Sequence, residues 1–265
     1  MDKLLIFNFA LIAVIAAALW FVKKYAKGER TQSIVLIAAA IFTIVFHYSS
    51  FGIKLLTGGN ALEYLRQTPN LILPIYPCNV VMWSALIFAF LKNKKSKLGS
   101  FLADYLFWFG MVSTLVGMFA NVDFIKNPTL ADYENIKSIG AHATLLFNVL
   151  LLPSFGYIKA DVKRNITSIV ISIFQMAAIG GYCNLVFLTL ASEEIAYDVN
   201  AMFLIHSPFD GVDFLIYPVI ALIAVPIYFF VFVVCDLCAH KKGERFYDKI
   251  KGKNNLSDGS NFRSR

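Results

Sequence analysis

The chain has 265 residues, of which 58% are hydrophobic and only 15% are charged. Soluble domains carry about 25% charged residues, and one core of this size cannot bury so much apolar surface, so the composition excludes a water-soluble globular protein. The net charge of +7 does not indicate binding to nucleic acid, because the basic residues lie between apolar runs. They do not gather on one face together with aromatic or polar side chains that could contact bases.

Seven apolar runs are long enough to cross a bilayer as helices, since a hydrocarbon core of about 30 Å needs about 20 residues. The first run follows Asp2 and Lys3 and lacks a small-residue cleavage site, so we interpret it as a retained span and not as a signal peptide. The expected fold class is an all-α, polytopic seven-helix bundle over residues 1–239, followed by a basic tail over 240–265 whose end is disordered. The expected helices cover 4–22, 33–51, 71–91, 98–120, 138–158, 166–190 and 213–236.

Lysine and arginine predict the orientation of this bundle, because cytoplasmic connectors retain positive charge during insertion. Most of the 24 basic residues lie in the connectors after the first, third and fifth expected helices and in the tail. The opposite connectors carry a group of acidic residues, including Glu193 and Glu194. The sequence therefore predicts a multi-pass protein of the cell membrane with its N-terminus outside and its C-terminus in the cytoplasm.

Polar side chains are costly inside a bundle, so their depth is informative. At 1.5 Å per residue, several fall in the outer third of the membrane, and the inner halves of the helices offer little beyond Asp104, Asn148 and Gln175. This layer is either a functional cavity or a set of interhelical hydrogen bonds, and both interpretations stay open. Its members are His47, Tyr48, Cys78, Asn79, His142, Tyr182, Cys183 and Asn184, and Asn121 and Asp123 end the fourth expected helix on the same side.

Cys78 follows two prolines, Pro74 and Pro77, which remove backbone donors and open the start of the third expected helix. A thiol beside such backbone becomes a nucleophile when a histidine lowers its pKa, and otherwise it is a small core residue. His47 and His142 lie at a suitable depth, and the sequence does not decide which of them reaches Cys78.

Two further groups of polar side chains are possible sites. Cys235 and Cys238 form a CxxC pair, but they end an apolar helix and lack a second pair, so no metal or cofactor is expected. Asp104 lies near the inner end of the fourth expected helix, where it either couples ions or protons or, as we favour, lies at the membrane interface.

Three segments carry a family resemblance. Residues 73–79 (LPIYPCN) resemble the LPLHLCD signature at the start of a central helix in the YwaF family of bacterial membrane proteins, which includes animal transmembrane protein 164. Residues 140–142 (GAH) are similar to the family's sHG segment, and 200–204 (NAMFL) to its NYMYL segment ahead of the last helix. Length, helix count and motif order agree over nearly the whole chain. Three positions differ: Tyr76 stands for a His, Asn79 for an Asp and Ala201 for a Tyr.

The resemblance implies a seven-helix fold and, through the animal branch, acyl transfer onto glycerophospholipids through an acyl-cysteine. Cys78 matches the nucleophile and His142 its partner. The leading hypothesis is thus a thiol-dependent lipid acyltransferase or acyl hydrolase at the outer leaflet, with membrane lipids as partners. Five further residues are expected to bind substrate or support the site: His47, Tyr76, Asn79, Asn184 and Asn200. Of these, Asn79 or Asn184 would donate a hydrogen bond to the oxyanion.

Two other functions use the same polar layer. A small-molecule transporter or binding protein would place its cavity there, and a transporter would also need polar residues that continue to the cytoplasmic side and paired broken helices. A receptor-like sensor shares the helix count. The sequence does not predict the substrate or any oligomeric partner.

Overall fold

The computed structural model describes residues 2–121, 124, 129–158, 161–190, 193–208 and 211–248, and within these ranges the chain is all-α, with no strand. This confirms the all-α part of the expected fold class, whereas the count of seven membrane-spanning helices and the orientation stay predictions. Six of the helices are long and apolar enough to cross a membrane. They are α1 (Asp2–Tyr25), α2 (Glu29–His47), α6 (Lys97–Phe119), α8 (Tyr133–Ser154), α9 (Val162–Leu190) and α11 (Tyr217–Ala239).

The third expected helix is shorter in the structure than we predicted. The expected range was 71–91, whereas α5 covers Pro77–Phe90, only 14 residues. Proline forces the residue before it into extended backbone, and Tyr76 has φ −119° and ψ 152°, so the helix begins at Pro77. The residues before it form a short 3₁₀ turn, η1 (Pro69–Leu71), and irregular backbone. At 1.5 Å per residue, α5 is about 21 Å long, less than a full bilayer core.

The second expected helix, 33–51, is also divided. Helix α2 ends at His47, and a new helix, α3 (Ser49–Leu56), begins after Tyr48. After residues 57–60 the chain forms α4 (Ala61–Gln67), and the side chain of Asn60 caps the first turn of this helix. The long connector ahead of α11 likewise contains α10 (Glu193–Val199) and η2 (Ala201–Phe203).

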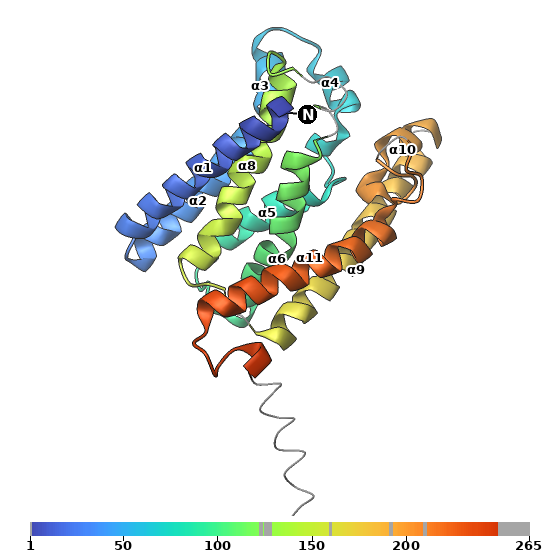
Figure 1. The fold of residues 1–265 in the computed structure, drawn as a ribbon. Helices are drawn as coiled ribbons and strands as arrows, with labels where there is room; N and C mark the ends of the chain where they lie inside the picture. Colours follow the sequence, from blue (N-terminus) through green and yellow to red (C-terminus); the bar gives the residue numbers. More distant parts are fainter. Residues whose placement is uncertain are drawn as a thin grey trace, which may run out of the picture.

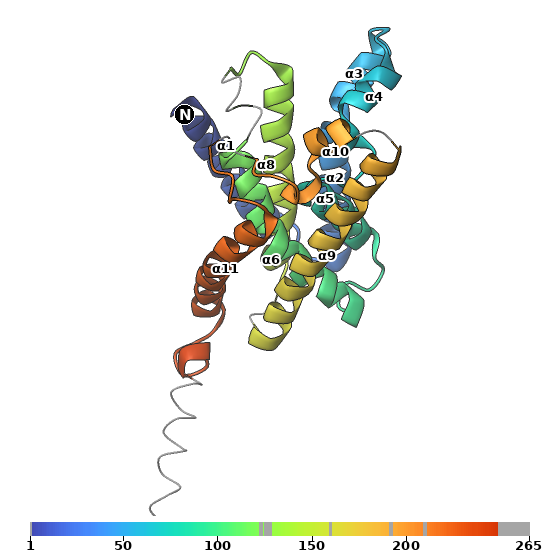
Figure 2. The ribbon, with the colours of Figure 1, turned by 90° about the vertical axis from the view of Figure 1, so that its right-hand side faces the viewer.

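Helices α5, α6 and α8 meet at a small residue. A Cβ atom on Gly110 of α6 would lie 2.8 Å from Val149 of α8 and 3.0 Å from Val81 of α5, so only glycine permits this approach. Asn148 fixes α2 to the same group, since its amide donates to the carbonyl of Ala39 and to the hydroxyl of Thr43. Helix α8 runs beside α1 and α2 (Figure 1), and α6 lies between α9 and α11 in the view of Figure 2.

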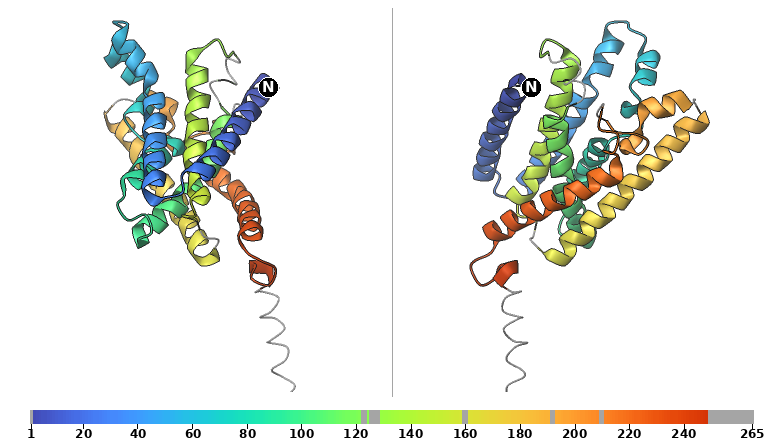
Figure 3. Two further views of the ribbon diagram at one scale, coloured as in Figure 1. Left: turned by 90° about the vertical axis from the view of Figure 1, so that its left-hand side faces the viewer. Right: turned by 45° about the vertical axis from the view of Figure 1, so that its right-hand side comes forward.

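The two ends of the molecule differ. The N-terminus lies at the same end as α3, α4 and α10, and the residues after α11 lie at the opposite end (Figures 1 and 3). At that second end, an ion pair of 2.5 Å joins Lys95, before α6, to Glu29, at the start of α2. Lys94 is buried beside them, where its ammonium donates to the carbonyl of Leu91 and to the hydroxyl of Ser33, and loss of hydration lowers its pKa.

Candidate functional site

Cys78 lies in the first turn of α5, directly after the proline that begins the helix. Its side chain is half-buried against the main apolar core. The thiol is within reach of the backbone N–H groups of Cys78 and Asn79 in this first turn. The sequence thus places the sulfur at the positive end of the helix dipole, where a negative charge is stabilised.

Asn79 fixes this helix start. Its side-chain oxygen accepts the N–H of Tyr76 at 3.2 Å, and its own N–H donates to the Tyr76 carbonyl at 3.0 Å. The residue is buried, so these bonds replace contacts to water. The Nδ2 group is the part of the Asn79 amide that remains to donate to a substrate.

The segment before Cys78 is held by the loop ahead of α11. The N–H of Met202 donates to the carbonyl of Ile75 at 2.8 Å, and the rings of Tyr76 and Phe203 stack with centroids 5.7 Å apart. Two segments that lie more than 120 residues apart in the chain and carry the family resemblance are therefore neighbours, which supports a common role.

Asn200 and Asn184 shape that loop. Asn200 has φ 43°, and its side chain donates to the carbonyl of His206 at 2.8 Å and accepts the N–H of Ile205 at 3.0 Å. Asn184 of α9 contacts Ala201 twice, accepting its N–H at 2.8 Å and donating to its carbonyl at 3.2 Å. Both amides are thus engaged with backbone, which assigns them to positioning and weakens the case for Asn184 as a donor to an oxyanion.

The loop carries backbone strain. Asn200, Met202 and Phe203 all have positive φ, a conformation that is costly for residues with a Cβ atom. Gly180 of α9 makes room for it, since a Cβ there would lie 2.7 Å from the Cβ of Met202. Strained backbone persists only where its surroundings impose it, and it concentrates at functional sites.

His142 lies on α8 and faces α6. Its Nδ1 lies 2.7 Å from the carbonyl of Ser138, and its ring packs on Gly117, where a Cβ atom would come within 2.1 Å of it. Asn121 joins the same helices by donating to the hydroxyl of Ser138 at 2.9 Å. The expected outer-layer residue Asp123 lies outside the described residues.

His47, at the end of α2, is the second imidazole. It faces the backbone carbonyl of Asn70, and its Nε2 is buried with no hydrogen-bond partner in the described structure. Lys137 and His142 lie close enough to interact with it electrostatically. A buried nitrogen without a partner is unusual in a native protein, so His47 is a candidate acceptor for a substrate or water proton.

The expected polar layer thus separates into two groups. One group lies at the start of α5 and in the loop that supports it, and consists of Tyr76, Cys78, Asn79, Asn184 and Asn200. The other consists of His47 at the C-terminal end of α2 and His142 in the first half of α8. Between the described residues of the two groups, no hydrogen bond joins the Cys78 thiol to an imidazole. Catalytic hydrogen bonds are often long in the absence of substrate, so this separation leaves the pairing untested.

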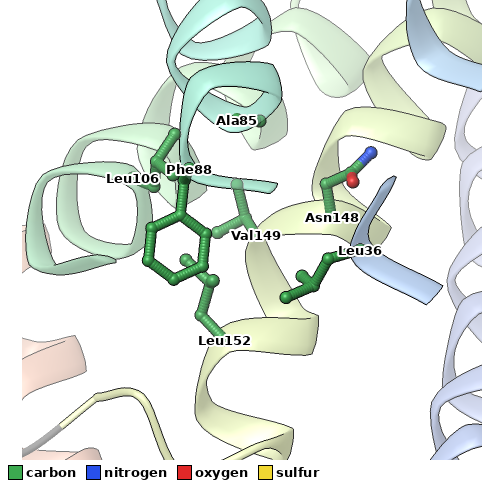
Figure 4. Close-up of a pocket in the computed structure, with 7 residues that line it drawn as sticks. All are labelled: Leu36, Ala85, Phe88, Leu106, Asn148, Val149 and Leu152. Atoms are coloured by element: carbon green, nitrogen blue, oxygen red, sulfur yellow. The ribbon is translucent and has the colours of Figure 1, made fainter. Parts of the chain in front are cut away.

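One enclosed pocket lies deeper in the bundle, between α2, α5, α6 and α8 (Figure 4). It is lined by Leu36, Phe88, Leu152 and other apolar side chains, with Asn148 at one edge (Figure 4). Its volume of about 10 Å³ is enough for about one water molecule and far too small for a lipid. It is therefore a packing defect and not a substrate site.

The end of the bundle where α6 and α9 begin contains a buried polar cluster. Asp104 is fully buried in the protein and pairs through both carboxylate oxygens with Nε and Nη2 of Arg164, whereas its expected position at the membrane interface stays a prediction. Ser168 and Ser172 follow Arg164 at intervals of four residues, so they share one face of α9, and both are buried. This spacing is the signal that could have revealed the cluster, which we missed because Arg164 was assigned to a connector.

These features define a helical multi-pass membrane protein with a thiol at an opened helix start. The chain belongs to the TMEM164 family, whose family model matches residues 2–236. Comparisons with curated proteins and with solved structures gave no match.

Proposed function

We propose that this protein is a membrane-bound acyltransferase that moves a fatty acyl group between glycerophospholipids through Cys78. The observation that carries the proposal is the location of the thiol at the first turn of α5, within reach of the backbone N–H groups of Cys78 and Asn79. These groups and the helix dipole stabilise a thiolate, which is the reactive form of cysteine, against the cost of burying its charge. The resemblance of 73–79 to the family signature supports the same residue as nucleophile.

In the proposed reaction, the Cys78 sulfur attacks the carbonyl carbon of a lipid ester, and the thiol proton passes to an imidazole. The tetrahedral intermediate collapses as its C–O bond breaks, and the imidazole returns the proton to the departing alcohol oxygen. An acyl thioester remains on Cys78. A hydroxyl of a second lipid, or water for hydrolysis, then attacks the thioester carbonyl, loses its proton to the imidazole and releases the thiol.

The supporting roles follow from the contacts. The Nδ2 group of Asn79 and the backbone N–H groups of the first turn are the proposed donors to the oxyanion. Tyr76, Asn200 and Asn184 position the segment that carries the thiol. His142 is the proposed base by family resemblance, and His47 is the alternative because its Nε2 lacks a partner.

We further propose that the chain crosses the cell membrane seven times, N-terminus outside and C-terminus inside. Six long helices alone would return the chain to its starting side, whereas its two ends lie at opposite ends of the molecule (Figure 1). The short helix α5, extended by residues 68–76, supplies the seventh crossing. This topology puts Cys78 at the depth of the ester carbonyls in the outer leaflet.

The test compares Cys78→Ala with Cys183→Ala, a buried thiol of α9. Cells expressing each variant are assayed for phospholipid composition and for labelling of the protein by an acyl-directed activity probe. Loss of both signals in Cys78→Ala alone supports the proposal. Unchanged labelling and lipid composition in Cys78→Ala would remove the thiol mechanism.

A transporter is the second candidate function, because the buried Asp104 and Arg164 pair supplies polar groups on the inner side that transport would require. Vesicles containing the purified protein discriminate the two. Uptake that is retained in Cys78→Ala and lost in Asp104→Asn would favour transport over acyl transfer.

A further inference from the structure

We propose that the end of the bundle opposite the thiol binds a phosphate group, supplied by the headgroup of an anionic phospholipid. The site is an open cleft of about 520 Å³ between the first turns of α6 and α9. Lys95, Lys97 and Ser100 line one wall, and Arg164 and Asp161 line the other. The proposal does not depend on Cys78 or on any acyl transfer.

The charges in the cleft favour an anion. Lys97 makes no ion pair or side-chain hydrogen bond within the described part of the chain. Lys95 pairs with Glu29, but both side chains are more than 70% exposed, so this pair is weak and readily exchanged. Asp161 is the acidic residue of the lining, and its carboxylate accepts the N–H of Arg164 at 2.8 Å as a helix cap.

Arg164 is held in place for a ligand. Two of its donors bind the fully buried Asp104, which fixes the guanidinium, and 33% of its side-chain surface remains exposed. A guanidinium has five N–H donors, so donors remain for an incoming oxygen. A fixed guanidinium with two mobile ammonium groups is a typical arrangement for phosphate recognition.

The first turns of two helices contribute to the lining. Helix α6 begins at Lys97, with Ser96 as its cap, and α9 begins at Val162. The positive ends of the helix dipoles add to the positive charge of the lysine and arginine side chains.

A further observation is an unpaired donor next to Arg164. Asn165 lies in the same first turn of α9, is 1% exposed, and its Nδ2 has no hydrogen-bond partner among the described residues. This group can only donate, so the first turn of α9 has a donor without an acceptor.

A lipid is the favoured source of the phosphate because the cleft also contains Phe101 and opens at the end of membrane-spanning helices. At the end of the bundle that carries the basic connectors, anionic headgroups of the cytoplasmic leaflet are the nearest phosphates. Free inorganic phosphate has the same recognition chemistry, so the experiment separates the two sources.

The experiment uses the purified full-length protein in detergent micelles. Native mass spectrometry measures retention of dioleoylphosphatidic acid and of dioleoylphosphatidylcholine, with and without competing inorganic phosphate. The double variant Lys95→Gln/Lys97→Gln is compared with Lys92→Gln, an exposed lysine of the same connector that does not line the cleft. We expect phosphatidic acid to bind roughly 30-fold more weakly to the double variant and unchanged to Lys92→Gln.

Competition by millimolar inorganic phosphate would support the phosphate site and assign it to the free ion. Equal retention of the two lipids by the native protein, together with no effect of phosphate, would overturn the proposal. Equal loss of binding in the double variant and in Lys92→Gln would also overturn the proposal. In that case, binding would depend on the net positive charge of the protein and not on the cleft.

Discussion

Two adjacent glycines of α9 provide a direct test of how the Cys78 segment is supported. A Cβ atom on Gly180 would lie 2.7 Å from the Cβ of Met202, whereas a Cβ on Gly181 would meet nothing within 4 Å. Met202 carries the N–H that binds the carbonyl of Ile75, three residues before the thiol. Alanine at either position has the same effect on helix propensity, but only alanine at position 180 disturbs the packing of the loop. Comparing the two variants therefore isolates the effect of loop packing on stability and activity.

The expected magnitudes have opposite signs. Gly180→Ala must push the strained loop away from α9, and such overpacking costs about 1–3 kcal/mol. Gly181→Ala removes backbone freedom from a helix interior without a clash, which stabilises by about 0.5–1 kcal/mol. At about 2–4 °C per kcal/mol for a chain of this size, the apparent Tm falls by roughly 2–12 °C in Gly180→Ala and rises by about 1–4 °C in Gly181→Ala.

The assay is tryptophan fluorescence of the purified protein during heating, followed by measurement of phospholipid acyl transfer at a temperature where both variants are folded. Gly180→Ala is expected to lose activity because the 2.8 Å bond from Met202 to Ile75 is displaced. Equal Tm values and equal activities for the two variants would refute the claim that this loop positions the thiol.

Two further predictions address the imidazole and the buried ion pair. Gly117→Ala displaces the ring of His142, because the ring would lie 2.1 Å from the new Cβ atom. The rate of acyl transfer is therefore expected to fall at least about 10-fold. As a control, Gly52→Ala adds a Cβ atom with nothing within 4 Å, so the rate stays unchanged in the same assay. Equal rates for these two variants would argue against His142 as the base. Asp104→Leu leaves the Arg164 guanidinium without its partner, so the free energy of unfolding is expected to fall by about 3–5 kcal/mol. The measurement is the denaturation temperature of the purified protein. The double variant Asp104→Leu/Arg164→Leu is expected to recover much of the lost stability. A double variant no more stable than Asp104→Leu would contradict this account of the pair.

The long helices were predictable because length and composition alone specify them. Each of the six spans has at least 19 residues and is apolar enough to cross a bilayer. The early start that we predicted for the third helix had a specific cause. Leu71 to Tyr76 are apolar enough to continue a span, but Pro74 and Pro77 impose extended backbone on Leu73 and Tyr76, which overrides hydropathy.

The site was predictable in its residue types but not in its pairings. Depth along each helix placed Cys78, His142 and Asn184 in one layer, but depth does not specify which face of a helix turns toward which neighbour. Asn184 turns to the backbone of Ala201, and His142 turns to Gly117. The inner cluster was missed for a related reason, because a buried Arg164 cannot be told from a solvated connector arginine until its partner Asp104 is located.

The central claim, that Cys78 carries the acyl group, is tested most directly by mass spectrometry of the purified protein after incubation with a defined phospholipid. We predict an acyl adduct on the peptide containing Cys78 that hydroxylamine removes, that persists in Cys183→Ala and that is absent in Cys78→Ala. An active preparation with no adduct on Cys78, or with undiminished acyl transfer in Cys78→Ala, would contradict the account.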